Sequence, residues 1–160
     1  MIGEIKNDPR IHIPIFGNGD INSPEKAVEY KNKYGVDGIM IGRAAIGYPW
    51  VFREIKHFIA TGEHMAGPTI EERVEVARKH LIGSLAWKGP IAGINEMRRH
   101  YANYLRGLPN IKDYRAKLVR MTEQAEIEAV LDEIKVTYKD MIIESGKIVL
   151  ENYHEHCPIN

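Results

Sequence analysis

The chain has 160 residues, 44% of them hydrophobic and 28% charged, which is typical of about one globular domain with an apolar core. No run approaches the roughly 18 apolar residues of a membrane span, and the charged first ten residues do not resemble a signal peptide. The formal net charge is zero and the single cysteine cannot form an internal disulfide, so we expect a cytoplasmic protein without a membrane partner.

The first third of the sequence predicts a βαβ unit. Two short apolar runs, 11–16 and 39–41, each end in a glycine-containing turn and predict two buried parallel strands. Between them, Ser23 followed by Pro24 is typical of a capped helix start. The helical segments predicted in this part are 23–34, 44–46 and 50–59.

The second part of the sequence predicts helices. A linker, 61–68, contains two glycines and a proline and marks a domain boundary. After it, Thr69 and Glu72 have the spacing of a capping box, and Gly89 with Pro90 predicts an interruption. The helices predicted here are 69–87, 91–105, 112–120 and 122–138.

These patterns predict an α/β fragment with two parallel strands, followed by an all-α helical bundle, so that the chain is mostly helical. We place the first domain at 1–62, the helical domain at 63–146 and a tail at 147–160. Cys157 lies in this tail beside His154 and His156. A terminal segment does not hold a nucleophile in register, and the other histidines lack ligand spacing, so we expect no metal site.

The two strand-end turns form a candidate phosphate site. Glycines in 17–20 and at Gly42 leave backbone N–H groups free to meet an anion, and Arg43 adds a charged donor. Two such turns fit successive βα steps of a (β/α)₈ barrel, where loops often bind phosphate. The alternative is that the glycines only make tight turns. No G-x-G-x-x-G or Walker A sequence is present, which disfavours a Rossmann or P-loop site.

Charge is distributed unevenly along the second half. Residues 88–120 contain eight basic and two acidic residues, whereas residues 121–160 contain nine acidic and three basic residues. The basic block is interleaved with aromatics and indicates contact with a polyanion such as RNA. The alternative is a solvated helix face, and we expect Trp87, Tyr101 and Tyr104 to be core residues at helical spacing.

Two segments, 13–21 and 35–52, resemble the tRNA-dihydrouridine synthases, which are FMN-dependent (β/α)₈ barrels with a C-terminal helical domain. The pair Lys88-Gly89, the segment 98–101 and the pair Tyr104-Leu105 are similar to the helical domain of bacterial members. The likeness covers about residues 11–134. It implies that the chain holds the last two βα units, the last quarter of an FMN-binding TIM barrel, followed by a helical tRNA-binding domain.

The resemblance also implies roles for individual residues. The expected cofactor-binding residues are Asn18, Gly19, Asp20, Gly42 and Arg43, and Asp20 is expected to order its turn and cap the following helix. The expected tRNA-binding residues are Lys88, Arg98, Arg99, His100, Arg106 and Arg115. The catalytic cysteine of the family lies upstream of the matching segment, so we expect no catalytic residue in this chain.

In the family, NADPH reduces FMN, and the reduced flavin converts a uridine of tRNA to dihydrouridine. We expect the isolated chain to be an inactive fragment that binds FMN weakly and self-associates through an exposed barrel edge. Two alternatives remain open. One is a fragment of another FMN-dependent TIM-barrel oxidoreductase, and the other is a stand-alone RNA-binding helical module.

Overall fold

A computed structural model describes residues 2–141, 143–144 and 147–148. The chain divides into two compact units, Met1–Met65 and Ala66–Asn160. Among the described residues, no helix has the length and apolarity required to cross a membrane. The predicted tail lies outside the described residues apart from 147–148, and so do Cys157 and the two histidines beside it.

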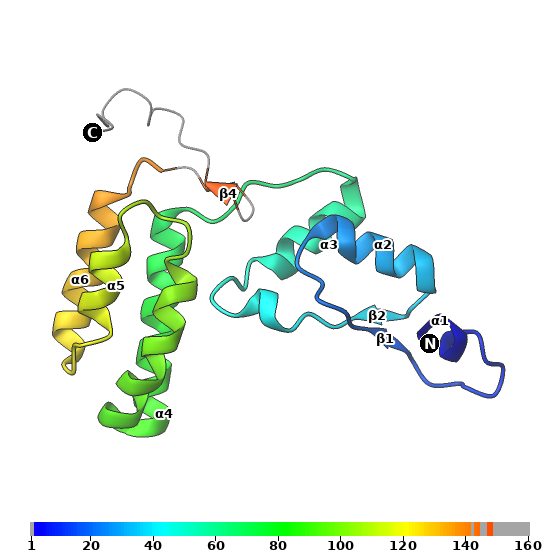
Figure 1. Cartoon of the computed structure of the whole chain (residues 1–160), viewed down its shortest axis with the longest axis horizontal. Helices are drawn as coiled ribbons and strands as arrows, with labels where there is room; N and C mark the ends of the chain where they lie inside the picture. Colours follow the sequence, from blue (N-terminus) through cyan, green and yellow to red (C-terminus); the bar gives the residue numbers. More distant parts are fainter. Residues whose placement is uncertain (1, 142, 145–146, 149–160) are drawn as a thin grey trace. The chain divides into compact units, whose positions relative to one another are not determined.

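The chain is mostly helical, as predicted (Figure 1). The first unit contains α1 (Ile2–Lys6), β1 (Phe16–Gly17), α2 (Pro24–Tyr34), β2 (Gly38–Ile39), the 3-10 turn η1 (Arg43–Ala45) and α3 (Val51–Thr61). The second unit contains α4 (Ile70–Tyr104), α5 (Lys112–Leu118), α6 (Gln124–Thr137), β3 (Ile143–Glu144) and β4 (Lys147–Ile148). The strands β3 and β4 pair antiparallel. The short helix α1 was not predicted, because residues 1–10 show little periodicity.

The strands β1 and β2 pair in parallel, which confirms the predicted βαβ order. Phe16 lies opposite Gly38, and the N–H of Met40 donates to the carbonyl of Gly17 at 2.9 Å. Both strands are shorter than predicted. Pro14 has no N–H for a ladder, and beyond Gly17 the first strand turns away, so that residues 40–41 have no strand opposite them among the described residues.

Local capping signals define α2 as predicted. The Ser23 hydroxyl accepts a hydrogen bond from the N–H of Lys26 at 3.3 Å, and Pro24 occupies the first turn. At the other end, Gly35 adopts φ 61° and its N–H donates to the carbonyl of Lys31. This left-handed cap suits glycine, which has no Cβ.

Asp37 fastens the start of β1 to the segment before β2. Its carboxylate accepts hydrogen bonds from the Lys6 ammonium at 2.6 Å and from the N–H of Ile15 at 2.8 Å. Its own N–H donates to the Ile15 carbonyl at 2.9 Å. The Lys6 ammonium, followed by the Ile15 N–H, holds the pKa of Asp37 below its ordinary value of 3.8. The Lys6 side chain therefore attaches helix α1 to the strand pair.

The helices α2 and α3 supply the core of the first unit. Ile21, Ala27, Val51 and Ile55 form a buried cluster, with Tyr30, Ile39, Ile41, Ala45 and Tyr48 packed against it. The other face of the strand pair has Phe16 and Met40 at 63% and 56% exposure, and Ile13 just before β1 is 71% exposed. The prediction that these strands are buried was therefore wrong for this face, because no described element of the first unit covers these side chains.

The helix α4 begins with the predicted capping box. The Thr69 hydroxyl accepts from the N–H of Glu72 at 3.1 Å, and the Glu72 carboxylate accepts from the N–H of Thr69 at 2.9 Å. The two side chains thereby satisfy backbone donors that have no partner within the helix.

A break at Gly89 divides α4 into two segments, as predicted. Gly89 has φ 78° and ψ 173°, a conformation that is essentially restricted to glycine, and Pro90 follows it. Across the break, the Ser84 hydroxyl donates to the carbonyl of Gly93 at 3.2 Å. The predicted core position of Trp87 was wrong, because this residue lies beside the break at Gly89 and is 82% exposed.

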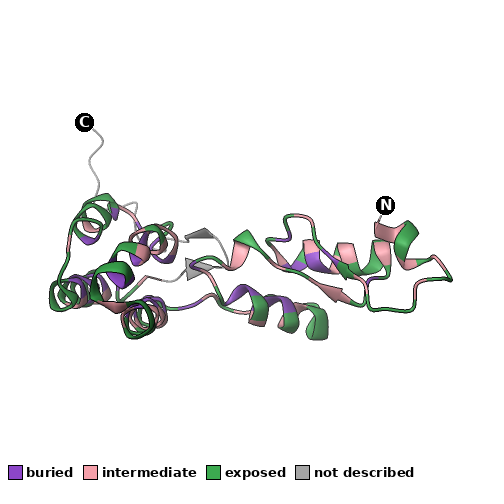
Figure 2. Cartoon of the chain, turned by 90° about the horizontal axis from the view of Figure 1, so that it is seen from below, coloured by how far each residue is buried: buried purple, intermediate pink, exposed green. Residues whose placement is uncertain are grey.

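The helices α4, α5 and α6 pack around one apolar core (Figures 1 and 2). Tyr101 and Tyr104 are buried there, as predicted. Among the described residues, three ion pairs join α4 to α6 at its surface: Arg78 with Asp132 at 2.5 Å, Arg78 with Glu128 at 3.6 Å, and Lys135 with Glu71 at 2.5 Å. The largest fully buried side chains of this unit are Tyr101, Ile70, Leu81, Met97, Leu105, Leu118, Ile127, Leu131 and Ile134.

The break in α4 predicts opposite effects of two glycine substitutions. Gly89→Ala should destabilise the chain by about 1–3 kcal/mol, because alanine is strained at this φ and ψ. Gly83→Ala should stabilise it by up to about 1 kcal/mol, because Gly83 lies inside a helix and a Cβ there meets nothing within 4 Å. Urea unfolding followed by circular dichroism measures both. Equal effects of the two substitutions would contradict the assigned break.

Candidate functional site

Asp20 joins the two predicted glycine turns. Its carboxylate is bonded to the Arg43 guanidinium, and its backbone carbonyl accepts a hydrogen bond from the Lys26 ammonium at 2.8 Å. Arg43 follows β2, Lys26 lies in the first turn of α2 and Asp20 follows β1. Three segments therefore meet at the carboxyl ends of the two parallel strands, the edge where α/β folds bind ligands. We call this group of residues, 18–20, Lys26 and 42–43, the strand-end corner.

The backbone of the strand-end corner offers unused donors. Within the described residues, the N–H groups of Gly19, Gly42 and Arg43 make no hydrogen bond. A Cβ added at Gly42 would meet nothing within 4 Å, so the space beside this residue is open. A Cβ at Gly19 would instead meet the Tyr30 hydroxyl, so the Tyr30 side chain packs against the bare backbone of this turn.

The 3-10 turn η1 positions Arg43. The N–H of Ala45 donates to the carbonyl of Gly42 at 3.0 Å, and the following Tyr48 hydroxyl donates to the carboxylate of buried Glu54 at 2.6 Å. The turn is therefore tied to α3, while the Arg43 side chain remains 81% exposed. Its guanidinium has donors available beyond those that reach Asp20.

Asp20 differs from its predicted role as the cap of α2. Asp20 does not cap α2, because Ser23 occupies the cap and the Asp20 carboxylate binds Arg43 instead. Asp20 also has φ 50°, a left-handed conformation that aspartate tolerates better than most residues. Asn18 is exposed, and its amide lies 3.8 Å from the sulfur of Met40, so it too links the two turns.

Lys26 is a member of the strand-end corner that the sequence did not single out. Its position in the first turn of a helix is unfavourable for a cation and gave no signal of function. With Arg43 and Lys26 opposing Asp20, the corner has two cations and one anion. This balance favours an incoming anion, although the Asp20 carboxylate occupies one side of the guanidinium.

In the second unit, two of the predicted RNA-binding cations are paired. The Glu96 carboxylate binds the Lys88 ammonium and accepts from the Arg99 guanidinium at 2.6 Å. The Lys88 ammonium, followed by Arg99, holds the pKa of Glu96 below its ordinary value. Lys88 also lies 4.8 Å from the centre of the exposed Trp87 ring. These two cations are thus partly neutralised by one carboxylate.

Arg98 and His100 are partly buried. The Arg98 guanidinium donates to the carbonyl of Met121 at 3.5 Å, so it contributes to joining α4 to the segment before α6. The His100 ring lies 4.6 Å from that of His80. Burial, followed by the charges of His80 and Arg99, lowers the pKa of His100, so its ring is mainly neutral at pH 7 and offers a hydrogen bond rather than a charge.

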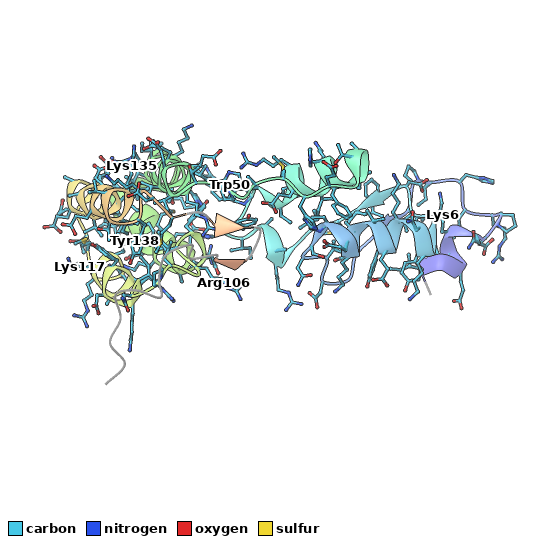
Figure 3. The ribbon with its side chains drawn as sticks, turned by 90° about the horizontal axis from the view of Figure 1, so that it is seen from above. Lys6, Trp50, Arg106, Lys117, Lys135 and Tyr138 are labelled. Atoms are coloured by element: carbon cyan, nitrogen blue, oxygen red, sulfur yellow. The ribbon has the colours of Figure 1, made fainter. Side chains whose placement is uncertain are left out.

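Arg106 and Arg115 are exposed, and their side chains have no ion pair within the described part of the chain (Figure 3 labels Arg106). Arg73, which the sequence did not single out, lies buried behind Arg106. Its guanidinium donates to the carbonyls of Tyr104 at 3.4 Å and Arg106 at 3.1 Å. Arg73 therefore holds the turn that carries Arg106.

Comparisons with known proteins connect both units to one family. The family model for dihydrouridine synthase matches residues 1–141. The chain is 45% identical over 116 residues to tRNA-dihydrouridine synthase B of Pseudomonas putida, a match that covers 72% of this chain and 34% of the relative. It is 33% identical over 138 residues to a probable tRNA-dihydrouridine synthase of Rickettsia conorii, covering 86% and 40%. The chain thus spans little more than a third of these relatives, and it belongs to the dihydrouridine synthase family.

Proposed function

We propose that this chain is the part of a flavin-dependent tRNA-dihydrouridine synthase that binds the FMN phosphate and contacts tRNA. The meeting of two glycine turns and Arg43 at the carboxyl ends of parallel strands carries this proposal. The names of the relatives support the reaction on tRNA. In this proposal residues 1–62 are the last two βα units of a TIM barrel, residues 63–146 bind tRNA, and 147–160 form a tail.

The residues of the strand-end corner fit a phosphate group. The N–H groups of Gly19, Gly42 and Arg43 are free donors, and the exposed Arg43 guanidinium supplies charge. When bound and reduced by NADPH, FMN would supply the hydride for the reduction of uridine. The residues of this chain bind and orient the cofactor through its phosphate, and we propose no catalytic role for any of them.

Binding of phosphate by the strand-end corner competes with the ion pair of Arg43. Asp20 repels an incoming phosphate, whereas Arg43 and Lys26 attract it. Because guanidinium carries five donors in a planar fork, Arg43 can bind phosphate with the edge that Asp20 leaves free. Asp20 thus positions Arg43 and at the same time limits the affinity.

In the second unit, cations that lack acidic partners would bind the phosphates of tRNA. Arg106 and Arg115 are the members of the predicted set that meet this condition within the described residues. Phosphate contacts position an RNA without reading its bases. The alternatives of another flavin oxidoreductase or an isolated RNA-binding module are less favoured, because the matched family model extends over both units.

The phosphate assignment predicts the effect of removing Arg43. Arg43→Ala should weaken FMN binding by about tenfold or more, because a charge-assisted contact is lost. Asp20→Asn should strengthen binding by removing the competing anion. Arg10→Ala is a matched control, since Arg10 is also an exposed arginine bonded to an aspartate, Asp8. Equilibrium dialysis with FMN measures all three, and equal affinity of Arg43→Ala and wild type would exclude the assignment.

The RNA assignment predicts salt-dependent binding of tRNA. With a few phosphates neutralised, a plot of log affinity against log salt should fall with a slope of about −3. Arg106→Ala should make the slope shallower by about one. Lys117→Ala should change it less, because Lys117 pairs with Glu133 at 3.6 Å. Fluorescence anisotropy with labelled tRNA gives the slopes, and a slope near zero would remove tRNA from the proposal.

We also propose that the uncovered face of the strand pair mediates self-association of this chain. Phe16 and Met40 expose apolar surface beside strands that have no further neighbour among the described residues. The double variant Phe16→Gln, Met40→Gln should lower the average mass measured by light scattering at high concentration, whereas Trp87→Gln in the other unit should not. A monomeric wild type at that concentration would refute the proposal.

A further inference from the structure

One face of α5 lines a hollow of about 710 Å³ in the second unit. Lys112, Arg115, Ala116 and Val119 lie at the spacing of a single helix face and form one wall. Buried Leu108 and Ile111, together with Ala102, form an apolar floor. The hollow therefore combines apolar surface with two long cationic side chains.

The cations of this hollow have no acidic partner. Within the described residues, neither Lys112 nor Arg115 makes a side-chain hydrogen bond or an ion pair, and both are exposed. Arg106 and Arg120, in the turns before and after α5, are also exposed and make no side-chain hydrogen bond or ion pair with the described residues. The other cations of the basic block differ, since Lys88 and Arg99 bind Glu96, Lys117 binds Glu133 and Arg98 donates to the Met121 carbonyl. The positive charge that remains free is thus concentrated around α5.

A neighbouring hollow on another face of α5 lacks this free positive charge. It has a volume of about 620 Å³ and is lined by Asp113, Lys117, Tyr114 and Thr137 among others. This hollow contains the negative charge of Asp113 as well as the positive charge of Lys117, and the Lys117 ammonium lies 3.6 Å from Glu133. The second hollow therefore offers an anion no net attraction, although it has a similar size and contains more aromatic surface.

We propose that the hollow beside Lys112 and Arg115 takes one unpaired nucleotide of an RNA. An unstacked nucleotide presents a flat base for the apolar floor and a phosphate for the two cations, whereas a base-paired nucleotide keeps its faces within the stack. The inference rests on the proposed binding of tRNA and adds a preference for unpaired over duplex RNA. The site selects single-stranded structure and reads no particular base.

Filling the hollow without changing its charge tests this inference. The probes are an RNA hairpin with a seven-nucleotide loop and a blunt duplex with the same number of phosphates, measured by fluorescence anisotropy with the whole chain. Wild type should bind the hairpin about tenfold more tightly than the duplex. Ala116→Trp, on the exposed wall, should abolish this preference and leave duplex affinity unchanged. Val119→Phe is a second filling variant and should act in the same way.

Two matched controls separate charge and bulk from the hollow itself. Arg120→Ala removes a free cation outside the hollow and should weaken both probes equally. Thr137→Trp fills the neighbouring hollow and should change neither. Circular dichroism confirms that each variant keeps its helices.

The outcomes distinguish this inference from the proposed function. If wild type binds both RNAs but Ala116→Trp and Val119→Phe keep the preference for the hairpin, the nucleotide site is wrong and RNA binding stands. If wild type binds neither RNA, both fail. If an octamer of glutamate binds as tightly as the hairpin and is displaced by both filling variants, the hollow is a site for acidic peptides and the inference is overturned.

Discussion

The bond between the Arg43 guanidinium and the Asp20 carboxylate joins two loops that are more than twenty residues apart in sequence. The Lys26 ammonium donates to the backbone carbonyl of Asp20, so that α2 is held beside the same two loops. Because each loop follows one of two parallel strands, this bond converts two separate turns into one cationic surface with free N–H groups. The assignment of a phosphate site depends on this arrangement, since neither turn alone has enough donors.

The basic residues of the second unit fall into two groups, those paired with carboxylates and those without an acidic partner in the described part of the chain, and a count of charges does not separate them. Residues 88–120 carry eight basic residues, but Glu96 neutralises part of that charge at one end of the block, and Glu133 in α6 partners Lys117. The cations that stay free of acidic partners within the described residues lie in and around α5. The aromatics follow a similar division, because Tyr101 and Tyr104 are core residues whereas Trp87 is exposed at the break of α4.

Local signals in the sequence predicted helix ends well, because capping and glycine conformations depend on a few neighbouring residues. Ser23, Thr69 with Glu72, and Gly89 all act as expected. Tertiary features were less accessible. The strands are shorter and more exposed than their apolar composition indicates, since burial depends on what covers a face. Lys26 was missed and Asp20 was misassigned as a cap, because hydrogen bonds between distant segments leave no local pattern.

The most direct test of the strand-end corner follows individual backbone N–H groups during phosphate binding. In proton–nitrogen correlation spectra of the whole chain titrated with inorganic phosphate, the signals of Gly19, Gly42 and Arg43 should shift together and saturate with one dissociation constant. Gly35, a capping glycine of the same unit, should not shift. If the three signals remain still, or saturate at different phosphate concentrations, the two turns do not form a common anion site and the flavin assignment is wrong.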